Sequence, residues 1–343
     1  MSVSGSDSAL EAISDHMDDG THSALDETDS GYWDQESTTQ SVTASIYDYE
    51  RLHNRTYHSF HRGKYLMPND ESEQDRIDIT YHAVRLSFKD NLFFAPLPNP
   101  RAILDIGTGT GTWALEAAET HPEANVVGTD LSPIQPNYVT PNLTFEIADA
   151  DEEWAFPHRF DLVHSRIMSD FTLRSWPHFF EQAFQYLNPG GWVECQEFDY
   201  NRRSDDSTIP PDSRLSFWER EWTRGMEMTG LGGFCKPELT MEQMRNAGFV
   251  NVTCHRYKIP IGPWPKDPQL RQAGMFGLVN ILDGIQGLSL KIFMELLGYS
   301  LDELENLLTD CRREARDRTV HSYWPLFVIL GQKPADAETP AQA

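Results

Sequence analysis

The stretch Ala102-Ile-Leu-Asp-Ile-Gly-Thr-Gly-Thr-Gly-Thr112 decides the fold. A compact apolar run is followed by three glycines at alternate positions and then by the helical pattern of residues 113–118. This order predicts a strand, a sharp turn and a helix. Glycine has no Cβ atom, so the backbone can turn tightly and a ligand can approach it, while the N–H groups at the start of the helix face the same space. We expect a flat, polar ligand there.

A second strand-like run, residues 126–130, ends on Asp130 about twenty residues after the glycines. At this distance a βαβ unit presents a carboxylate to ribose hydroxyls, so we expect a cofactor that contains a nucleoside. A dinucleotide fingerprint reads G-x-G-x-x-G, whereas here the third glycine comes one residue earlier and Thr112 takes its place. The spacing therefore disfavours an NAD-dependent oxidoreductase.

The G-x-G-x-G segment, with an aspartate two residues before its first glycine, resembles motif I of the class I S-adenosylmethionine-dependent methyltransferases. The resemblance implies a Rossmann-like α/β fold with S-adenosyl-L-methionine as the cofactor. In that family the acidic residue and the glycines face the methionine end of the cofactor. A glycine-rich turn in another doubly wound protein is the alternative for this motif taken alone. The residues that the resemblance places at the cofactor are Asp105, Gly107, Thr108, Gly109 and Gly111.

Strand-like and helical runs alternate along the chain, which predicts a mostly parallel, seven-stranded sheet with helices on both faces. By resemblance to the superfamily, the last strand forms an antiparallel hairpin. Helices are expected over 71–91, 175–187 and 240–249, and Asn188-Pro-Gly-Gly191 is expected to form a turn. The expected strands are residues 102–106, 126–130, 143–148, 160–164, 192–198, 250–259 and 323–330.

Ligands of such sheets bind beyond the carboxyl ends of the strands. The resemblance assigns Asp130 to the ribose hydroxyls, Leu131 to the adenine face and Asp149 to the adenine amino group. Asp151 is the alternative to Asp149, because both lie in one acidic run. The other cofactor contacts expected are Ala150 and Ser165 at the strand ends and Tyr65 upstream of the first strand.

Shorter runs narrow the resemblance to the fungal LaeA-type methyltransferases, which regulate secondary metabolism and associate with velvet proteins. It implies a methyltransferase that regulates or participates in fungal secondary metabolism, with velvet-type partners. The alternatives are a biosynthetic enzyme that methylates an oxygen or nitrogen of a small-molecule acceptor, and a non-catalytic scaffold that binds the cofactor. The resemblance covers roughly residues 46–334 and is carried by Tyr57-His58, Arg62-Gly-Lys-Tyr65, Pro68, Gly128-Thr-Asp-Leu-Ser-Pro-Ile-Gln-Pro136 and Leu187-Asn-Pro-Gly-Gly-Trp192.

Methyl transfer from a sulfonium is an in-line displacement, so the protein must mainly align the acceptor with the methyl group and exclude water. A general base helps only when the acceptor has a proton to lose. The candidates are His164 at the end of the fourth strand and Glu197 or Asp199 at the end of the fifth. Imidazoles titrate nearer to neutral pH than carboxylates, which favours His164 over Glu197 and Asp199. The alternative is a hydrogen-bonded structural role, which is the commoner one for a histidine at a strand end. His58 and His61 are weaker candidates.

The chain has 343 residues and a net charge of −25, and no Lys or Arg precedes Arg51. This charge argues against direct nucleic-acid binding. The four cysteines form no C-x-x-C pair, so no metal site is expected. Neither a signal peptide nor an apolar run of membrane-spanning length is recognised, which predicts an intracellular protein without membrane contact, nuclear and/or cytoplasmic. No compact Lys/Arg run marks nuclear import, so a nuclear pool is expected to need a partner.

Composition and pattern divide the chain into segments. Residues 1–50 hold twelve Asp or Glu, and the first 44 residues lack any sustained period, which predicts disorder. The segments expected are a disordered acidic tail at 1–44, an N-terminal helical cover at 45–100, the methyltransferase core at 101–261, a helical lid at 262–320, the last core strand at 321–334 and a disordered tail at 335–343.

Overall fold

A seven-stranded sheet forms the centre of the computed structural model, which describes residues 47–169, 171–231 and 235–337. Across the sheet the first five strands are parallel, and β9 is antiparallel to both of its neighbours, in the order β5-β4-β3-β6-β7-β9-β8. The predicted Rossmann-like sheet with an antiparallel last hairpin is confirmed. Its strands are β3 (Ala102–Ile106), β4 (Asn125–Asp130), β5 (Leu143–Ile147), β6 (Phe160–Arg166), β7 (Leu187–Phe198), β8 (Val250–Ile261) and β9 (Ser322–Gln332).

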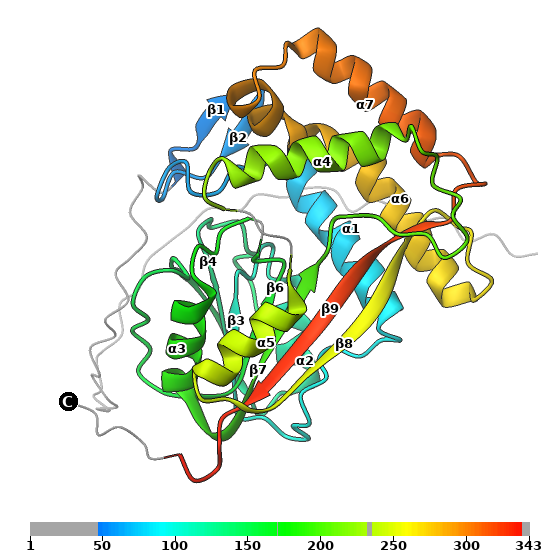
Figure 1. The fold of residues 1–343 in the computed structure, drawn as a ribbon. Coiled ribbons are helices and arrows are strands. Elements are labelled where there is room, and N and C mark those ends of the chain that lie inside the picture. Colours follow the sequence, from blue (N-terminus) through cyan, green and yellow to red (C-terminus); the bar gives the residue numbers. More distant parts are fainter. Residues whose placement is uncertain (1–46, 170, 232–234, 338–343) are drawn as a thin grey trace, which may run out of the picture. The chain divides into compact units, whose positions relative to one another are not determined.

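Seven α-helices and one π-helix accompany this sheet in the described part of the chain (Figure 1). Five of the α-helices begin after a Ser or Asp whose side chain accepts a hydrogen bond from a backbone N–H of the first turn, which is the usual N-cap arrangement. The helices are α1 (Glu71–Ser87), α2 (Thr112–Thr120), α3 (Trp176–Tyr186), α4 (Arg214–Glu227), α5 (Pro237–Asn246), α6 (Pro268–Ser289), the π-helix η2 (Leu290–Leu296) and α7 (Leu301–Ala315).

The inner strands are buried on both faces because helices cover the sheet on both sides. Ile103 packs in one core cluster together with Trp113 of α2. Its neighbour Leu104 packs in a second cluster, together with Phe179 and Phe180 of α3. Side chains alternate along a strand, so the two clusters are the two faces of one sheet. This arrangement leaves the carboxyl ends of the strands open for a site.

The segment 188–191 differs from the predicted turn. It lies inside β7 as an irregularity, because Phe160 of β6 pairs with Leu187 and Leu162 pairs with Trp192. The Gly190 N–H donates to the Lys333 carbonyl, so the segment stays bonded to the sheet although Gly190 has φ +82°. The local turn chemistry was recognised correctly, but the prediction that it precedes the strand was wrong.

A small hairpin near the N-terminus was not predicted. It consists of β1 (Glu50–Leu52) and β2 (Arg55–Tyr57), which pair in antiparallel fashion. The two loop residues His53 and Asn54 have φ of +50° and +61°, the signature of a type I′ turn. The predicted tail at 1–44, and residues 338–343 of the second predicted tail, lie outside the described residues.

One helical stretch, Pro268–Leu296, is long and apolar enough to cross a membrane by length and composition alone. This run differs from the expectation that the chain holds no apolar stretch of membrane-spanning length. Within the fold, 67% of its most apolar window is buried, as in the core helix of a folded domain. It packs against α1, α7 and β8, and α4 packs against α7 in turn (Figure 1).

Candidate active site

The glycine loop between β3 and α2 forms one wall of a cavity at the carboxyl ends of the strands. Gly109 has φ +58°, and a Cβ atom there would meet only Ile77 Cγ2, at 3.5 Å. Gly111 has φ +83°, and a Cβ atom there would come within 2.4 Å of the Phe145 ring. Both φ values belong to the left-handed region that favours glycine. The loop thus keeps the space at Gly109 open and lets α2 begin directly after Gly111.

Asp130, the last residue of β4, is hydrogen-bonded to this loop. Its carboxylate accepts from the Gly109 N–H at 2.8 Å and from the Ser132 N–H at 2.9 Å. Burial raises the pKa of Asp130 to about 6, although both hydrogen bonds favour the charged form. Leu131 is buried and lines the same cavity. The residues predicted for ribose and adenine therefore share a cavity with the glycines.

Asp105 and His164 form a buried pair on the neighbouring strands β3 and β6. His164 Nδ1 lies 2.7 Å from Asp105 Oδ1, and Thr108 Oγ1 donates to the other carboxylate oxygen at 2.6 Å. Trp113 stacks on the imidazole with a centroid separation of 3.7 Å. His164 lines the cavity, and its Nε2 has no hydrogen-bond partner among the described residues. A neutral His164 that donates from Nδ1 to Asp105 therefore carries an unused lone pair on Nε2.

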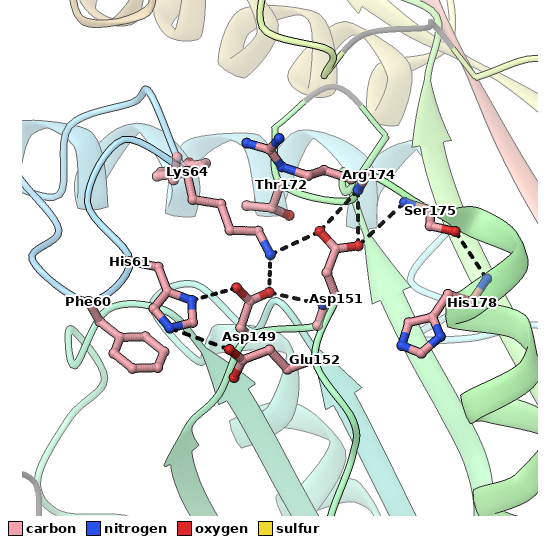
Figure 2. Close-up of polar contacts among 12 residues, drawn as sticks. Phe60, His61, Lys64, Asp149, Asp151, Glu152, Thr172, Arg174, Ser175 and His178 are labelled. Atoms are coloured by element: carbon pink, nitrogen blue, oxygen red, sulfur yellow. Dashed lines mark hydrogen bonds and ion pairs between the residues drawn. The ribbon is translucent and has the colours of Figure 1, made fainter.

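The cover segment, residues 58–69, is joined to the core by ion pairs (Figure 2). Lys64 pairs with Asp149, and its Nζ lies 2.9 Å from Asp151. His61 Nδ1 lies 2.8 Å from Asp149 Oδ2, and its Nε2 lies 3.4 Å from a carboxylate oxygen of Glu152. Burial alone would raise the pKa of Asp149, but hydrogen bonds from Lys64, the Asp151 N–H and His61 hold it below its ordinary value.

Of the two acidic residues considered for adenine, Asp149 lines the cavity together with Ala150, whereas Asp151 does not. The Asp151 carboxylate accepts from the N–H groups of Arg174 and Ser175, just before α3 (Figure 2). The geometry therefore favours Asp149 for the ligand. His61, Asp149 and Glu152 also bring ligand-type atoms within 4.8 Å of one another, but the ammonium group of Lys64 already neutralises Asp149.

His58 shapes the cover segment from inside. It is buried, its Nδ1 lies 2.6 Å from the Phe60 carbonyl, and its Nε2 accepts from the Tyr65 N–H at 3.1 Å. With both ring nitrogens engaged, His58 is not placed as a base. Tyr65 lines the cavity, as predicted for a cofactor contact. Asn69 also lines it, and the buried Nδ2 of Asn69 has no hydrogen-bond partner among the described residues.

Three predicted site residues, Gly111, Ser165 and Glu197, do not line the cavity. Ser165 lies on β6 between His164 and Arg166, so strand alternation turns it to the opposite face of the sheet. Glu197 is buried and accepts from the N–H groups of Met168 and Ser169 at 3.0 to 3.1 Å. Burial raises the pKa of Glu197 to about 7. Its carboxylate holds the loop after β6, so the structure does not support Glu197 as the base.

Helix α1 supplies a wall of the cavity that the sequence analysis missed. Arg76, Ile77, Thr80 and Tyr81 line it, at the spacing of one helical face. Among the described residues, none from 262–320 lines the cavity; α6 packs on α1 instead. The predicted lid helices therefore support this wall, and the cover segment lies nearer to the ligand. The mixture of polar and apolar residues on one face of α1 was the sequence signal that could have indicated a cavity wall there.

Lys64→Met is expected to lower the free energy of unfolding by about 2–3 kcal/mol at pH 7, because two carboxylates lose their cation while His61 remains. Arg62→Met is the matched control, since the Arg62 side chain is 57% exposed and, within the described ranges, pairs only with exposed Asp48; its effect should stay within about 0.5 kcal/mol. Urea unfolding of both variants measures the difference. Equal urea midpoints for the two variants would contradict a stabilising role of the Lys64 ion pairs.

The effect of Lys64→Met should also depend on pH. The pKa of Asp149 is lowered in the folded protein, so its contribution is present above its unfolded value of about 4 and is lost as the pH falls through the folded value. The two unfolding curves should therefore converge in acid. A difference that stays constant from neutral pH into acid would refute a role for the Asp149 charge.

The donor set of the cavity fits the cofactor that the glycine spacing implies. Gly109 leaves open space, Asp130 supplies a carboxylate for hydroxyl groups, and Asp105 supplies one for an ammonium group. In addition, three polar atoms of cavity-lining residues are buried without a partner in the described ranges: Asn69 Nδ2, His164 Nε2 and Arg166 Nη2. Buried polar groups are normally satisfied, so these atoms indicate a polar ligand.

Comparison with known proteins agrees with this geometry. A family model described as a methyltransferase domain matches residues 81–253. Methyltransferase pytC of Aspergillus terreus is 40% identical over 304 residues, which is 88% of this chain and 93% of that protein. Secondary metabolism regulator laeA of Aspergillus fumisynnematus is 31% identical, over 87% of this chain and 80% of its own. Protein-methionine methyltransferase laeA of Emericella nidulans is 32% identical, over 82% and 75%. The chain belongs to the class I S-adenosylmethionine-dependent methyltransferases, in their fungal LaeA-like group.

Proposed function

We propose that this methyltransferase methylates a small metabolite that binds in the cavity between α1 and the carboxyl ends of the strands. The observation that carries the proposal is the closed cover segment, which Lys64 and His61 join to Asp149. An extended protein substrate would have to break these ion pairs to reach the glycine loop. The aromatic rings of Phe171 and Tyr200 line the cavity and suit a flat organic molecule.

S-adenosyl-L-methionine supplies the methyl group when it is bound. The chain's own residues bind and orient the cofactor. The glycine loop and Asp105 hold its methionine end, and Asp130, Leu131 and Asp149 hold its nucleoside end. The cover segment excludes water from the reacting groups, so that water does not compete with the acceptor for the methyl group. His164, oriented by Asp105 and Trp113, accepts a proton on Nε2 from a hydroxyl or amine acceptor.

His164→Gln is expected to lower methyl transfer about 100-fold or more while changing cofactor affinity only slightly, because glutamine cannot accept the proton but keeps an N–H donor for Asp105. The assay incubates the protein with methyl-labelled cofactor and a small-molecule extract of cells in which the protein occurs. Label should enter the extract. His82→Gln, on the exposed face of α1, is the matched control and should transfer at the normal rate. An equal rate for both variants would remove His164 from the chemistry.

A regulatory role is the second candidate, and the relatives named as secondary metabolism regulators favour it. One relative is named a protein-methionine methyltransferase, so a protein acceptor belongs to this candidate. When a whole-cell lysate replaces the small-molecule extract in this assay, label that enters only protein would support it against the small-molecule proposal. A pull-down with velvet-domain proteins tests the partner, and retention of the chain is the supporting result.

The location of the protein follows from the same choice, and we propose a cytoplasmic pool with a nuclear pool that depends on a partner. The sequence has no compact Lys/Arg run that could act as an import signal by itself. Imaging of the tagged protein, with and without velvet-type partners, tests this proposal. A nuclear pool of equal size in both cases would contradict it.

A further inference from the structure

Arg166 is a half-buried cation that lines the cavity, and its Nη2 atom is buried. Its Nε donates to Gln196 at 2.8 Å, and its guanidinium carbon lies 5.3 Å from the centroid of the Tyr81 ring. It forms no ion pair with a carboxylate of the described residues, and its Nη2 is buried without a hydrogen-bond partner. A buried, unsatisfied guanidinium N–H is costly, and more so than a neutral donor. An unsatisfied guanidinium N–H of this kind indicates a ligand that supplies the missing hydrogen-bond acceptor.

The other arginine of the cavity is a contrasting case. Arg76 Nη2 donates to the buried carboxylate of Glu73 at 2.7 Å, and Arg76 Nη1 donates to Asn280 at 3.2 Å. Arg76 is therefore neutralised within the protein. Burial lowers the pKa of Arg166 to about 10, so Arg166 is still a cation at neutral pH. Of these two cavity-lining arginines, only Arg166 has a charge available for a ligand.

The position of Arg166 on β6 indicates which ligand group it meets. His164 and Arg166 are two residues apart on the strand, so both side chains are on the same face of the sheet. That face also carries Asp105, which is bonded to His164. A carboxylate and an unpaired guanidinium in one cavity are complementary to an α-amino acid group, which has one ammonium and one carboxylate.

We propose that Arg166 binds a carboxylate that a ligand brings into the cavity, donating to it from Nη2. The inference rests on the proposed function in that the cavity holds the methyl donor and its acceptor. Two ligands could supply the carboxylate: the methionine moiety of the cofactor or a carboxylated acceptor. The nearby Asp105 favours the first, because it can bind the ammonium group of the same moiety. The guanidinium fork suits either, because its parallel N–H groups match the geometry of a carboxylate.

The test titrates the full chain with S-adenosyl-L-methionine and with its decarboxylated form, which keeps the adenosine and the sulfonium. Arg166→Gln should weaken binding of the first compound about 10- to 100-fold and leave binding of the second unchanged. Arg166→Lys should recover part of the loss, because it keeps the cation. Arg85→Gln is the matched control: Arg85 pairs with Glu116 and does not line the cavity, so both affinities should be unchanged.

A second arm distinguishes the acceptor as the source of the carboxylate. Protein saturated with S-adenosylhomocysteine is titrated with benzoate, and benzamide serves as the uncharged comparison. Benzoate binding that Arg166→Gln abolishes, with cofactor affinity unchanged, assigns the carboxylate to the acceptor. If the folded variant matches the wild type in both arms, the carboxylate assignment is overturned. A wild-type chain that fails to bind the cofactor overturns the cofactor site itself, so the two failures are distinguishable.

Discussion

Asp130→Ala is expected to weaken binding of S-adenosyl-L-methionine by about 100-fold or more. The substitution removes the charged acceptor for the ribose hydroxyls, and each hydrogen bond to a charged group contributes about 1.5–3 kcal/mol. It also releases the Gly109 and Ser132 N–H groups that the carboxylate now holds at 2.8 and 2.9 Å. The loss therefore combines a missing ligand contact with a less ordered glycine loop. Isothermal titration of both proteins measures it.

Asp130→Asn is the matched control, because it keeps the size of the side chain and one carbonyl acceptor. Its affinity should lie between those of the wild type and the alanine variant. The wild-type affinity should also fall as the pH drops below about 6, because the buried carboxylate then binds a proton and accepts hydroxyl donors less well. An alanine variant with wild-type affinity would show that the cofactor does not contact Asp130.

In the cofactor-free protein, the raised pKa of Asp130 makes stability change with pH in the opposite direction to cofactor affinity. The folded pKa of Asp130 is raised above the unfolded value, so its stabilising contribution is full below about 4 and is lost as the pH rises through about 6. The ionised carboxylate is thus kept buried at a cost in stability. We infer that this cost is retained because the charged form binds the ligand.

Gly109→Val is expected to weaken cofactor binding by a comparable factor, for a steric reason. Gly109 has φ +58° and lines the cavity, and beyond its chain neighbours Ile77 Cγ2 is the only atom of the described residues within 4 Å of a Cβ built there. The valine methyl groups would therefore occupy space that the ligand needs. A β-branched residue at positive φ also strains the backbone by about 1–3 kcal/mol. Both affinity and stability should fall.

Gly298→Val separates these two effects. Gly298 has φ +76° with nothing within 4 Å of a built Cβ, and it lies outside the cavity. It should show a similar loss of stability with unchanged cofactor affinity. Thermal unfolding and titration of the two valine variants measure this. Equal cofactor affinity in both would mean that the glycine loop does not approach the ligand.

The sheet could be predicted from the sequence because its signals are local. The run 102–106 is mostly apolar and is followed by Gly107, the run 126–130 ends on Asp130, and the structure has strands at these places. The sites at Gly109 and Asp130 follow from the same unit, since their spacing along one βαβ segment brings them together. The start of the helix expected over 175–187 was recognisable for the same reason: α3 begins after Ser175, whose side chain accepts from the His178 N–H.

The features that were missed depend on contacts between distant parts of the chain. Lys64 and Asp149 are 85 positions apart, so nothing in either local run indicates that they pair. Arg166 becomes conspicuous only once the neighbouring strands are in place and it forms no ion pair with a carboxylate in the described part of the chain. Ser165 and Glu197 were assigned to the site because they are near strand ends. Strand alternation turns Ser165 away, and backbone N–H groups after β6 engage Glu197.

The most direct test of this account is isothermal titration of the folded full chain with S-adenosyl-L-methionine, with the product S-adenosylhomocysteine as a second ligand and NAD as the comparison. The cavity between the glycine loop, Asp130 and α1 predicts saturable binding of both sulfur nucleosides, one molecule per chain, and no heat of binding with NAD. Absence of binding by the sulfur nucleosides, in a protein shown by circular dichroism to be folded, would contradict the central claim.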